Sequence, residues 1–144
     1  MASAVSSVIR LEPVVRERMA DLETPVSAFA KLRPLGGAFL LESAEGGERM
    51  GRYSFIGVAP RELVVSRDGD PLDALRRAMA KYDRPGGGPG LPRFSGGAVG
   101  YVGYEAARHF ERIPLAPRDP HALPDAVFGI YDTVVAFDHL RHTM

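Results

Sequence analysis

The sequence predicts an α+β fold, built mainly from short antiparallel strands that are flanked by helices. Residues 36–57 contain two short apolar runs on either side of a glycine-bearing acidic turn at 44–51, a pattern typical of a β-hairpin. Two other segments begin with a capping residue followed by proline, the usual start of a helix. The first apolar run ends at the polar pair Glu42 and Ser43, so we expect any small ligand at this end of the hairpin.

The segments on either side of this hairpin have their own signals. Residues 8–15 are a candidate edge strand, where Pro13 is tolerated. A helix should start at Thr24-Pro25 and end before Pro34, because proline cannot continue it. Its predicted apolar face consists of Val26, Phe29, Ala30 and Leu32.

A third strand is predicted at 63–66 and a turn at 67–70, followed by a second helix that starts at Asp70-Pro71. Helical spacing suggests an apolar stripe in the core, and Asp73 is expected to pair with Arg77. The stripe consists of Leu72, Leu75, Met79 and Tyr82. The glycine- and proline-rich segment 84–92 is predicted to be an internal loop, a candidate junction between two substructures.

The last third contains a glycine-rich strand and a long apolar strand. A strand from Phe94 with this density of glycines indicates the close approach of another backbone or a ligand. These glycines are Gly96, Gly97, Gly100 and Gly103. A helix is expected at 104–112 and a loop at 115–124. Residues 126–138 are predicted to form one strand, and the apolar residues of 133–137 suggest a central position in a sheet.

Composition narrows the classes of function. The 144 residues suit a single domain, 1–144. Eighteen basic and 18 acidic residues give no net charge, so nothing favours a nucleic acid or an anionic membrane as partner. No cysteine is present, which excludes disulfides and thiolate chemistry. Because no signal peptide and no membrane span are evident, we expect a cytoplasmic protein.

No catalytic or metal-binding constellation is evident from residue spacing. The glycines at 96–103 do not lie between a strand and a helix start, as a dinucleotide-binding loop requires. Glu45 and Glu48 are better explained as a solvated turn than as metal ligands, and the histidines are scattered. Glu42 and Ser43 could hold the ammonium group and a polar edge of a small amphipathic ligand, or could cap nearby amides.

Several motifs in register resemble the N-terminal region of anthranilate synthase component I, over nearly the whole chain. The motifs are Asp21–Ser27 (DLETPVS), Phe39–Ser43 (FLLES), Gly51–Gly57 (GRYSFIG), Phe94–Tyr101 (FSGGAVGY), Tyr131-Asp132 and Phe137-Asp138-His139. The resemblance implies a partial version of a large α+β fold with two orthogonal antiparallel sheets flanked by helices.

The resemblance also implies a function. The full-length enzyme of that family converts chorismate, with ammonia from a glutamine amidotransferase partner, to anthranilate and pyruvate. It needs Mg²⁺, and tryptophan inhibits it as the end product of the pathway. The catalytic and Mg²⁺-binding residues belong to a C-terminal chorismate-binding domain that is absent from this chain. We therefore expect no catalytic residue, metal site or cofactor in residues 1–144.

The N-terminal region of that family contributes to the tryptophan site. Carried over by the motif, the regulatory contacts are Leu41, Glu42 and Ser43. A further contact falls among Arg52, Tyr53 and Ser54, and the alignment of the turn leaves open which. Expected partners are L-tryptophan, the chorismate-binding domain and the amidotransferase subunit. Two alternatives remain open: a stand-alone tryptophan-sensing or partner-binding module without enzyme activity, and the N-terminal part of an aminodeoxychorismate synthase component I. Whether the chain is a fragment or a short natural protein is also open.

Overall fold

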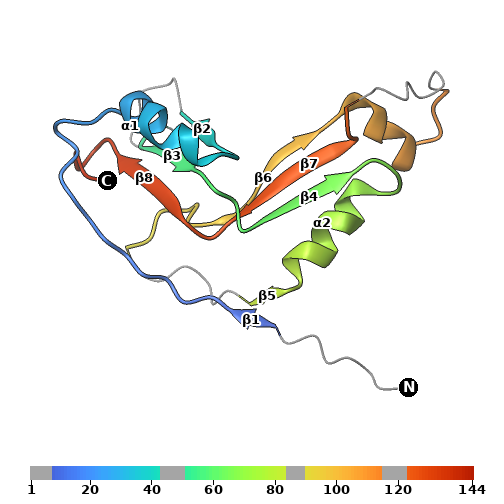
Figure 1. Ribbon diagram of the computed structural model, residues 1–144, viewed down its shortest axis with the longest axis horizontal. Coiled ribbons are helices and arrows are strands. Elements are labelled where there is room, and N and C mark those ends of the chain that lie inside the picture. The colour runs from blue at the N-terminus through green and yellow to red at the C-terminus, as the bar shows by residue number, and fades with distance from the viewer. Residues whose placement is uncertain (1–7, 43–50, 84–89, 115–122) are drawn as a thin grey trace.

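Two three-stranded antiparallel sheets dominate the fold. The computed structural model describes residues 8–42, 51–83, 90–114 and 123–144. One sheet has the order β2-β3-β8 and the other β4-β7-β6, and they occupy opposite halves of the molecule (Figure 1). Their strands are β2 (Phe39–Leu41), β3 (Tyr53–Gly57), β8 (Val134–Asp138), β4 (Glu62–Ser66), β7 (Ala126–Tyr131) and β6 (Gly97–Val102). The predicted α+β class and the hairpin of residues 36–57 are confirmed, although residues 43–50 of the turn lie outside the described residues.

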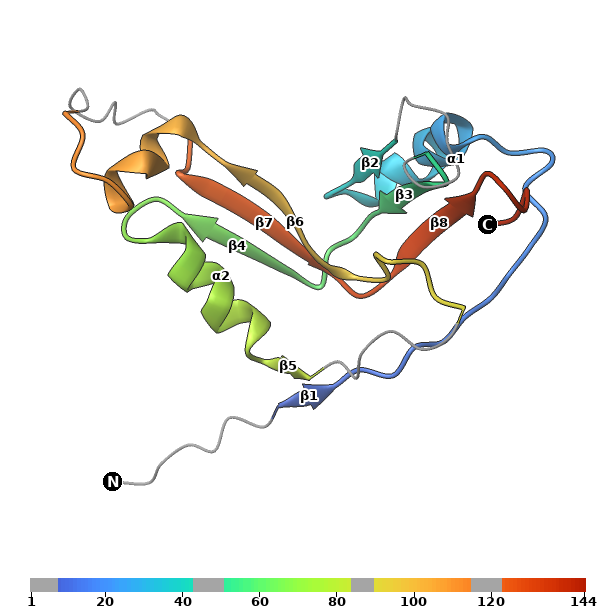
Figure 2. The same cartoon turned by 180° about the vertical axis from the view of Figure 1, so that it is seen from behind.

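The N-terminal segment connects the two halves along one side. Its described part contains the strand β1 (Ile9–Arg10), much shorter than the predicted 8–15, which pairs in parallel with β5 (Tyr82–Asp83). From β1 the chain runs along the half that contains β8 to the first helix, as the view from behind shows (Figure 2). Backbone hydrogen bonds between Arg18 and Met144, both at 2.8 Å, fix this segment to the end of the chain.

Helix α1 (Pro25–Leu32) begins as predicted. The Thr24 hydroxyl accepts a hydrogen bond from the Ser27 amide, and the Ser27 hydroxyl accepts one from the Thr24 amide, which forms a capping box. A short 3₁₀ turn, η1 (Arg33–Leu35), follows at Pro34. The predicted apolar face was partly wrong: Val26 is exposed, and Ala28 packs with Ile56 and Phe137 in the buried core.

Helix α2 (Pro71–Met79) is capped by the Asp70 carboxylate, which accepts hydrogen bonds from the amides of Leu72 and Asp73. The prediction that its apolar stripe fills the core was partly wrong, because Leu75 and Tyr82 are half-buried but Leu72 and Met79 are not. Leu72 is 42% exposed and Met79 36%, whereas Pro71 and Ala78 are buried. The helix therefore turns a face of small residues toward the sheet. Asp73 pairs with Arg76, one turn away, and not with Arg77 as expected.

One face of the sheet β4-β7-β6 is apolar and uncovered by the described residues. Glu62 hydrogen-bonds to Lys81 and Tyr82, just after α2, so its side of β4 faces the helix. Since side chains alternate along a strand, Leu63 and Val65 face the other way, and both are more than half exposed.

The predicted single strand 126–138 is two strands in different sheets. β7 lies between β4 and β6, and the chain then bends at Asp132 and Thr133 before β8 pairs with β3. Arg61 forms an ion pair of 2.6 Å with Asp132 at this bend. The expectation of a central position for 133–137 was also wrong, because β8 is an edge strand of the described sheet. Both halves are apolar, so the sequence pattern does not show where the pairing partner changes.

The glycine-rich strand β6 lies against β7, as its composition predicted. A Cβ atom on Gly100 would come within 1.9 Å of the Val127 carbonyl oxygen. Gly97 has space for a side chain, but its φ of +135° is unfavourable for other residues. The next element is a 3₁₀ helix, η2 (Tyr104–His109), instead of the predicted α-helix at 104–112, and its first residue follows Gly103, which offers no capping side chain. No described helix is long and apolar enough to cross a membrane.

We predict that Gly100→Ala destabilises the fold by about 2 kcal/mol or more, because β6 must move away from the β7 backbone and no rotamer change relieves the contact. Urea denaturation followed by circular dichroism measures this loss. Tyr101→Val on the same strand, at an exposed position, is the control and should change stability by less than about 0.5 kcal/mol. Equal stability of Gly100→Ala and wild type would refute the close approach.

Candidate functional site

The ends of β2 and β3 form the candidate site. Leu41 pairs with Phe55 across the hairpin, so the last residue of β2 lies next to the start of β3. Leu41 is 47% exposed, and Glu42, which follows it, is also exposed. Ser43 lies outside the described residues. The pairing thus brings the end of β2, which Glu42 follows, next to the start of β3, although ten residues of chain separate Glu42 from Tyr53.

An aromatic cluster extends from this site to the other sheet. We use this name for Phe39, Tyr53, Phe55, Phe94 and Tyr131. Tyr53 stacks on Phe55 with ring centroids 5.8 Å apart, and Phe94 makes edge contacts with Phe55 at 5.5 Å and Phe39 at 6.1 Å. Phe39 in turn contacts the edge of Tyr131 at 4.8 Å. By register, Leu41, Tyr53 and Phe55 share one face of the sheet, and the α1-facing residues Ser54 and Ile56 lie on the other.

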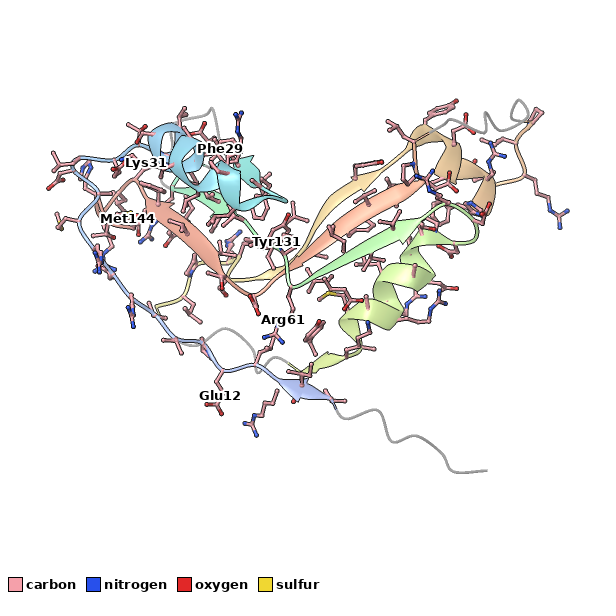
Figure 3. All side chains as sticks on the ribbon, viewed as in Figure 1. Glu12, Phe29, Lys31, Arg61, Tyr131 and Met144 are labelled. Carbon is pink, nitrogen blue, oxygen red and sulfur yellow. The ribbon has the colours of Figure 1, made fainter. Side chains whose placement is uncertain are left out.

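Tyr131 is the far end of the cluster. It lies where the two sheets meet (Figure 3), and its hydroxyl donates a hydrogen bond of 2.7 Å to the Gly37 carbonyl. Burial raises the pKa of this hydroxyl. The phenol is therefore neutral and a fixed donor, and it joins the end of β7 to the residues that lead into β2.

Arg52 and Asp138 form the main charged contact at the site. The Nη2 atom of Arg52 lies 2.6 Å from Oδ2 of Asp138, and Nε lies 3.1 and 3.2 Å from the two carboxylate oxygens. The same carboxylate accepts hydrogen bonds from the backbone amides of Leu140 and Arg141. The Arg52 guanidinium, helped by these amides, lowers the pKa of Asp138 to about 2. Arg52 also lies over the Tyr53 ring, 4.9 Å from its centroid, an arrangement that favours a cation–π contact.

Ser54 and His139 form a second contact between the same two strands. Oγ of Ser54 lies 2.7 Å from Nε2 of His139, and the His139 amide donates to the Arg52 carbonyl at 2.8 Å. Ser54 is only 2% exposed and lies on the α1 side of the sheet. Of the three alternative contacts at 52–54, the structure therefore leaves Arg52 and Tyr53 accessible and buries Ser54.

Two cavities border these residues. The larger, about 900 Å³, lies between residues 11–18 and the bend from β7 to β8, and Arg52, Tyr53 and Phe94 are among its lining residues. The smaller, about 280 Å³, lies at the start of α1 beside Asp138 and His139. The larger cavity therefore reaches Arg52 and Tyr53, the smaller one meets only the end of β8, and neither is lined by Leu41 or Glu42.

Within the described residues, no group of three or more acidic or histidine side chains could hold a metal ion. His139 and His142 have no third ligand there, and Glu45 and Glu48 lie outside that part of the chain. The Mg²⁺ that the family resemblance implies has no fitting donor set among these residues, so no reaction step is assigned to it.

Asp138 and His139 belong to a motif of the family resemblance but were not predicted to be site residues. The signal was present, because an aspartate and a histidine end an apolar strand in Phe137-Asp138-His139. Their partners are 86 and 85 residues away, so spacing along the chain could not reveal the contacts.

Comparisons with known proteins agree with the motif resemblance. A family model described as chorismate binding enzyme matches residues 36–144. The anthranilate synthase component 1 of Streptomyces coelicolor is 45% identical over 139 residues, which cover 96% of this chain and 27% of that protein. The protein of the same name from Acetivibrio thermocellus is 40% identical over 145 residues, which cover 90% and 29%. The crystal structure of anthranilate synthase component I from Streptococcus pneumoniae TIGR4 matches with a TM-score of 0.52 and 25% identity, covering 91% of this chain and 30% of that chain. The chain spans less than a third of the length of each of these three proteins.

We predict a loss of stability in acid that depends on Asp138. Its folded pKa of about 2 lies below the ordinary value of 3.8, so its ion pair stabilises the fold above about pH 4 and loses this contribution as the pH falls toward 2. We expect about 1–2 kcal/mol, allowing for solvent screening at the partly exposed Arg52. Urea unfolding between pH 5 and pH 2.5 should show a smaller loss for Asp138→Asn than for wild type. Asp132→Asn, at the other end of β8, leaves the Asp138 contacts in place and should keep the Asp138 contribution.

Proposed function

Because this chain belongs to the chorismate-binding enzyme family, we propose that it is the N-terminal, tryptophan-binding portion of an anthranilate synthase component I. In this proposal the chain supplies a feedback site and does not catalyse the reaction by itself. The complete enzyme converts chorismate and ammonia to anthranilate and pyruvate in the cytoplasm, with Mg²⁺ bound in its chorismate-binding domain. That domain and a glutamine amidotransferase subunit are the proposed protein partners.

The observation that supports a tryptophan site most directly is the mixture of groups at the ends of β2 and β3. Leu41 and Tyr53 offer apolar and aromatic surface suited to an indole ring. The exposed carboxylate of Glu42 suits the ammonium group of an amino acid, and Arg52 is a nearby cation for its carboxylate. Ser43, which the motif places next to Glu42, completes the proposed polar contacts.

A stand-alone sensing module is the second candidate. It is favoured by the location of Leu41, Glu42, Arg52 and Tyr53 within one hairpin, so that the proposed contacts do not depend on a second chain. The names of the related proteins favour the anthranilate branch over aminodeoxychorismate synthase. In the first candidate, tryptophan binding by this chain regulates a larger enzyme. In the second, this chain senses tryptophan without a catalytic domain.

We predict that the chain binds L-tryptophan and that Glu42→Gln weakens this binding about tenfold, the cost of losing one charged hydrogen bond. The chain contains no tryptophan, so fluorescence anisotropy of the ligand can be followed without a protein background. Titration calorimetry provides a second measurement. Glu111→Gln, which alters an exposed carboxylate after η2, is the matched control and should bind as wild type does. Absence of binding at millimolar tryptophan would refute the proposed site in this chain.

In a complete enzyme that contains this sequence, Ser43→Arg should raise the tryptophan concentration needed for half-inhibition by about tenfold or more, because a bulky cation would occupy the proposed ligand position. Turnover of chorismate without tryptophan should stay close to wild type. Steady-state assays with and without tryptophan separate the two effects. A parallel loss of turnover and inhibition would assign Ser43 a structural role instead.

A further inference from the structure

We propose that Asp138 and His139 are positioning residues of the tryptophan site, because they hold the start of β3 so that Arg52 and Tyr53 are presented to the ligand. This inference rests on the proposed function and adds two residues that lie outside the motif-derived contacts. Neither residue needs to touch tryptophan. Asp138 acts through Arg52, which directly precedes β3, and His139 acts through Arg52 and Ser54.

The Asp138 carboxylate holds the Arg52 side chain at three points of contact. Two nitrogens of Arg52 lie 2.6–3.2 Å from its oxygens, and the amides of Leu140 and Arg141 lie 3.1 and 3.2 Å from Oδ1. Asp138 is 8% exposed, so it is itself fixed, whereas the Arg52 side chain is 34% exposed. A long arginine side chain that is fixed before binding loses less conformational entropy when a ligand arrives.

Tyr53 is positioned by the same contact. The Arg52 guanidinium carbon lies 4.9 Å from the centre of the Tyr53 ring, and the other neighbour of this ring is Phe55, at 5.8 Å. Tyr53 also pairs directly with Asp138 in the register of β3 and β8. The Tyr53 ring, which we propose for indole binding, is therefore held between the fixed Arg52 cation and the Phe55 ring.

His139 fixes the backbone of the same residues. Its amide donates to the Arg52 carbonyl, and its ring nitrogen contacts the buried Ser54 hydroxyl at 2.7 Å. Residues 52 and 54, on both sides of Tyr53, are thus tied to the residue that follows β8. A shift of His139 would move Tyr53 relative to Leu41, which belongs to the next strand.

The test compares L-tryptophan affinity of the 144-residue chain and its variants by calorimetry and ligand anisotropy. We expect Asp138→Asn to weaken binding about tenfold. The matched control is Asp132→Asn, which breaks the ion pair of Asp132 with Arg61 at the opposite end of β8 and should leave affinity within about twofold of wild type.

A double-mutant cycle identifies action through Arg52. If Asp138 works by positioning Arg52, Asp138→Asn should weaken binding in the wild-type background and have no further effect once Arg52→Gln is present. A purely structural role would weaken binding by the same factor in both backgrounds. The NMR signal of the Arg52 Nε–H group gives a readout without ligand, because it should be resolved in wild type and in Asp132→Asn and lost in Asp138→Asn.

The outcomes separate this inference from the proposed function. No binding of tryptophan by wild type would overturn both. Binding by wild type that is equally strong in Asp138→Asn and Asp132→Asn would overturn the positioning role alone. If Asp138→Asn does not fold, His139→Ala decides the matter, since it removes the ring contact with Ser54 and keeps the Arg52–Asp138 pair. Wild-type affinity in folded His139→Ala would then overturn the positioning role.

Discussion

The described structure depends on the carboxylate of Asp138 more than on any other side chain. It neutralises Arg52 at the start of β3 and accepts the amides of the turn that follows β8. That turn closes through two backbone hydrogen bonds between Asp138 and Thr143, and Met144 pairs with Arg18 of the N-terminal segment. One nearly buried charge therefore brings together the hairpin, the end of the chain and the entrance to α1. Such a charge is tolerated in this position because its oxygens are paired with a cation and with backbone donors.

The elements that depend on local chemistry could be predicted from the sequence. Thr24-Pro25 and Asp70-Pro71 start helices because capping needs only neighbouring residues. The hairpin follows from apolar runs next to a turn. What depends on distant partners could not be predicted. Helix α2 packs through Pro71 and Ala78. Its orientation is set by the neighbouring sheet, and the spacing of apolar residues along the helix does not show where that sheet lies. The change from the sheet of β7 to the sheet of β8 at Asp132 could not be predicted for the same reason.

The candidate site shows the same division. The polar pair that ends the first apolar run predicts Glu42 and Ser43, and the family resemblance adds Leu41 and the residues Arg52 to Ser54. The structure distinguishes these last three residues by their exposure: Arg52 and Tyr53 are partly exposed, whereas Ser54 is buried against His139. The contacts of Asp138 and His139 could not be predicted from the sequence, since they exist only after strand β8 has paired with β3. The related proteins do not assign a role to either residue.

The bent segment 126–138 has a consequence for how the protein folds. Because β7 lies between two strands of one sheet and β8 completes the other, neither sheet can form fully without the last nineteen residues of the chain. Each sheet then closes loops that span much of the sequence, from Tyr53 to Asp138 and from Glu62 to Ile130. Long loop closures of this kind slow folding. Because the continuous segment 126–138 supplies one strand to each sheet, it joins the two halves into one cooperative unit. Residues up to Asp138 must therefore leave the ribosome before both sheets can complete their native pairing.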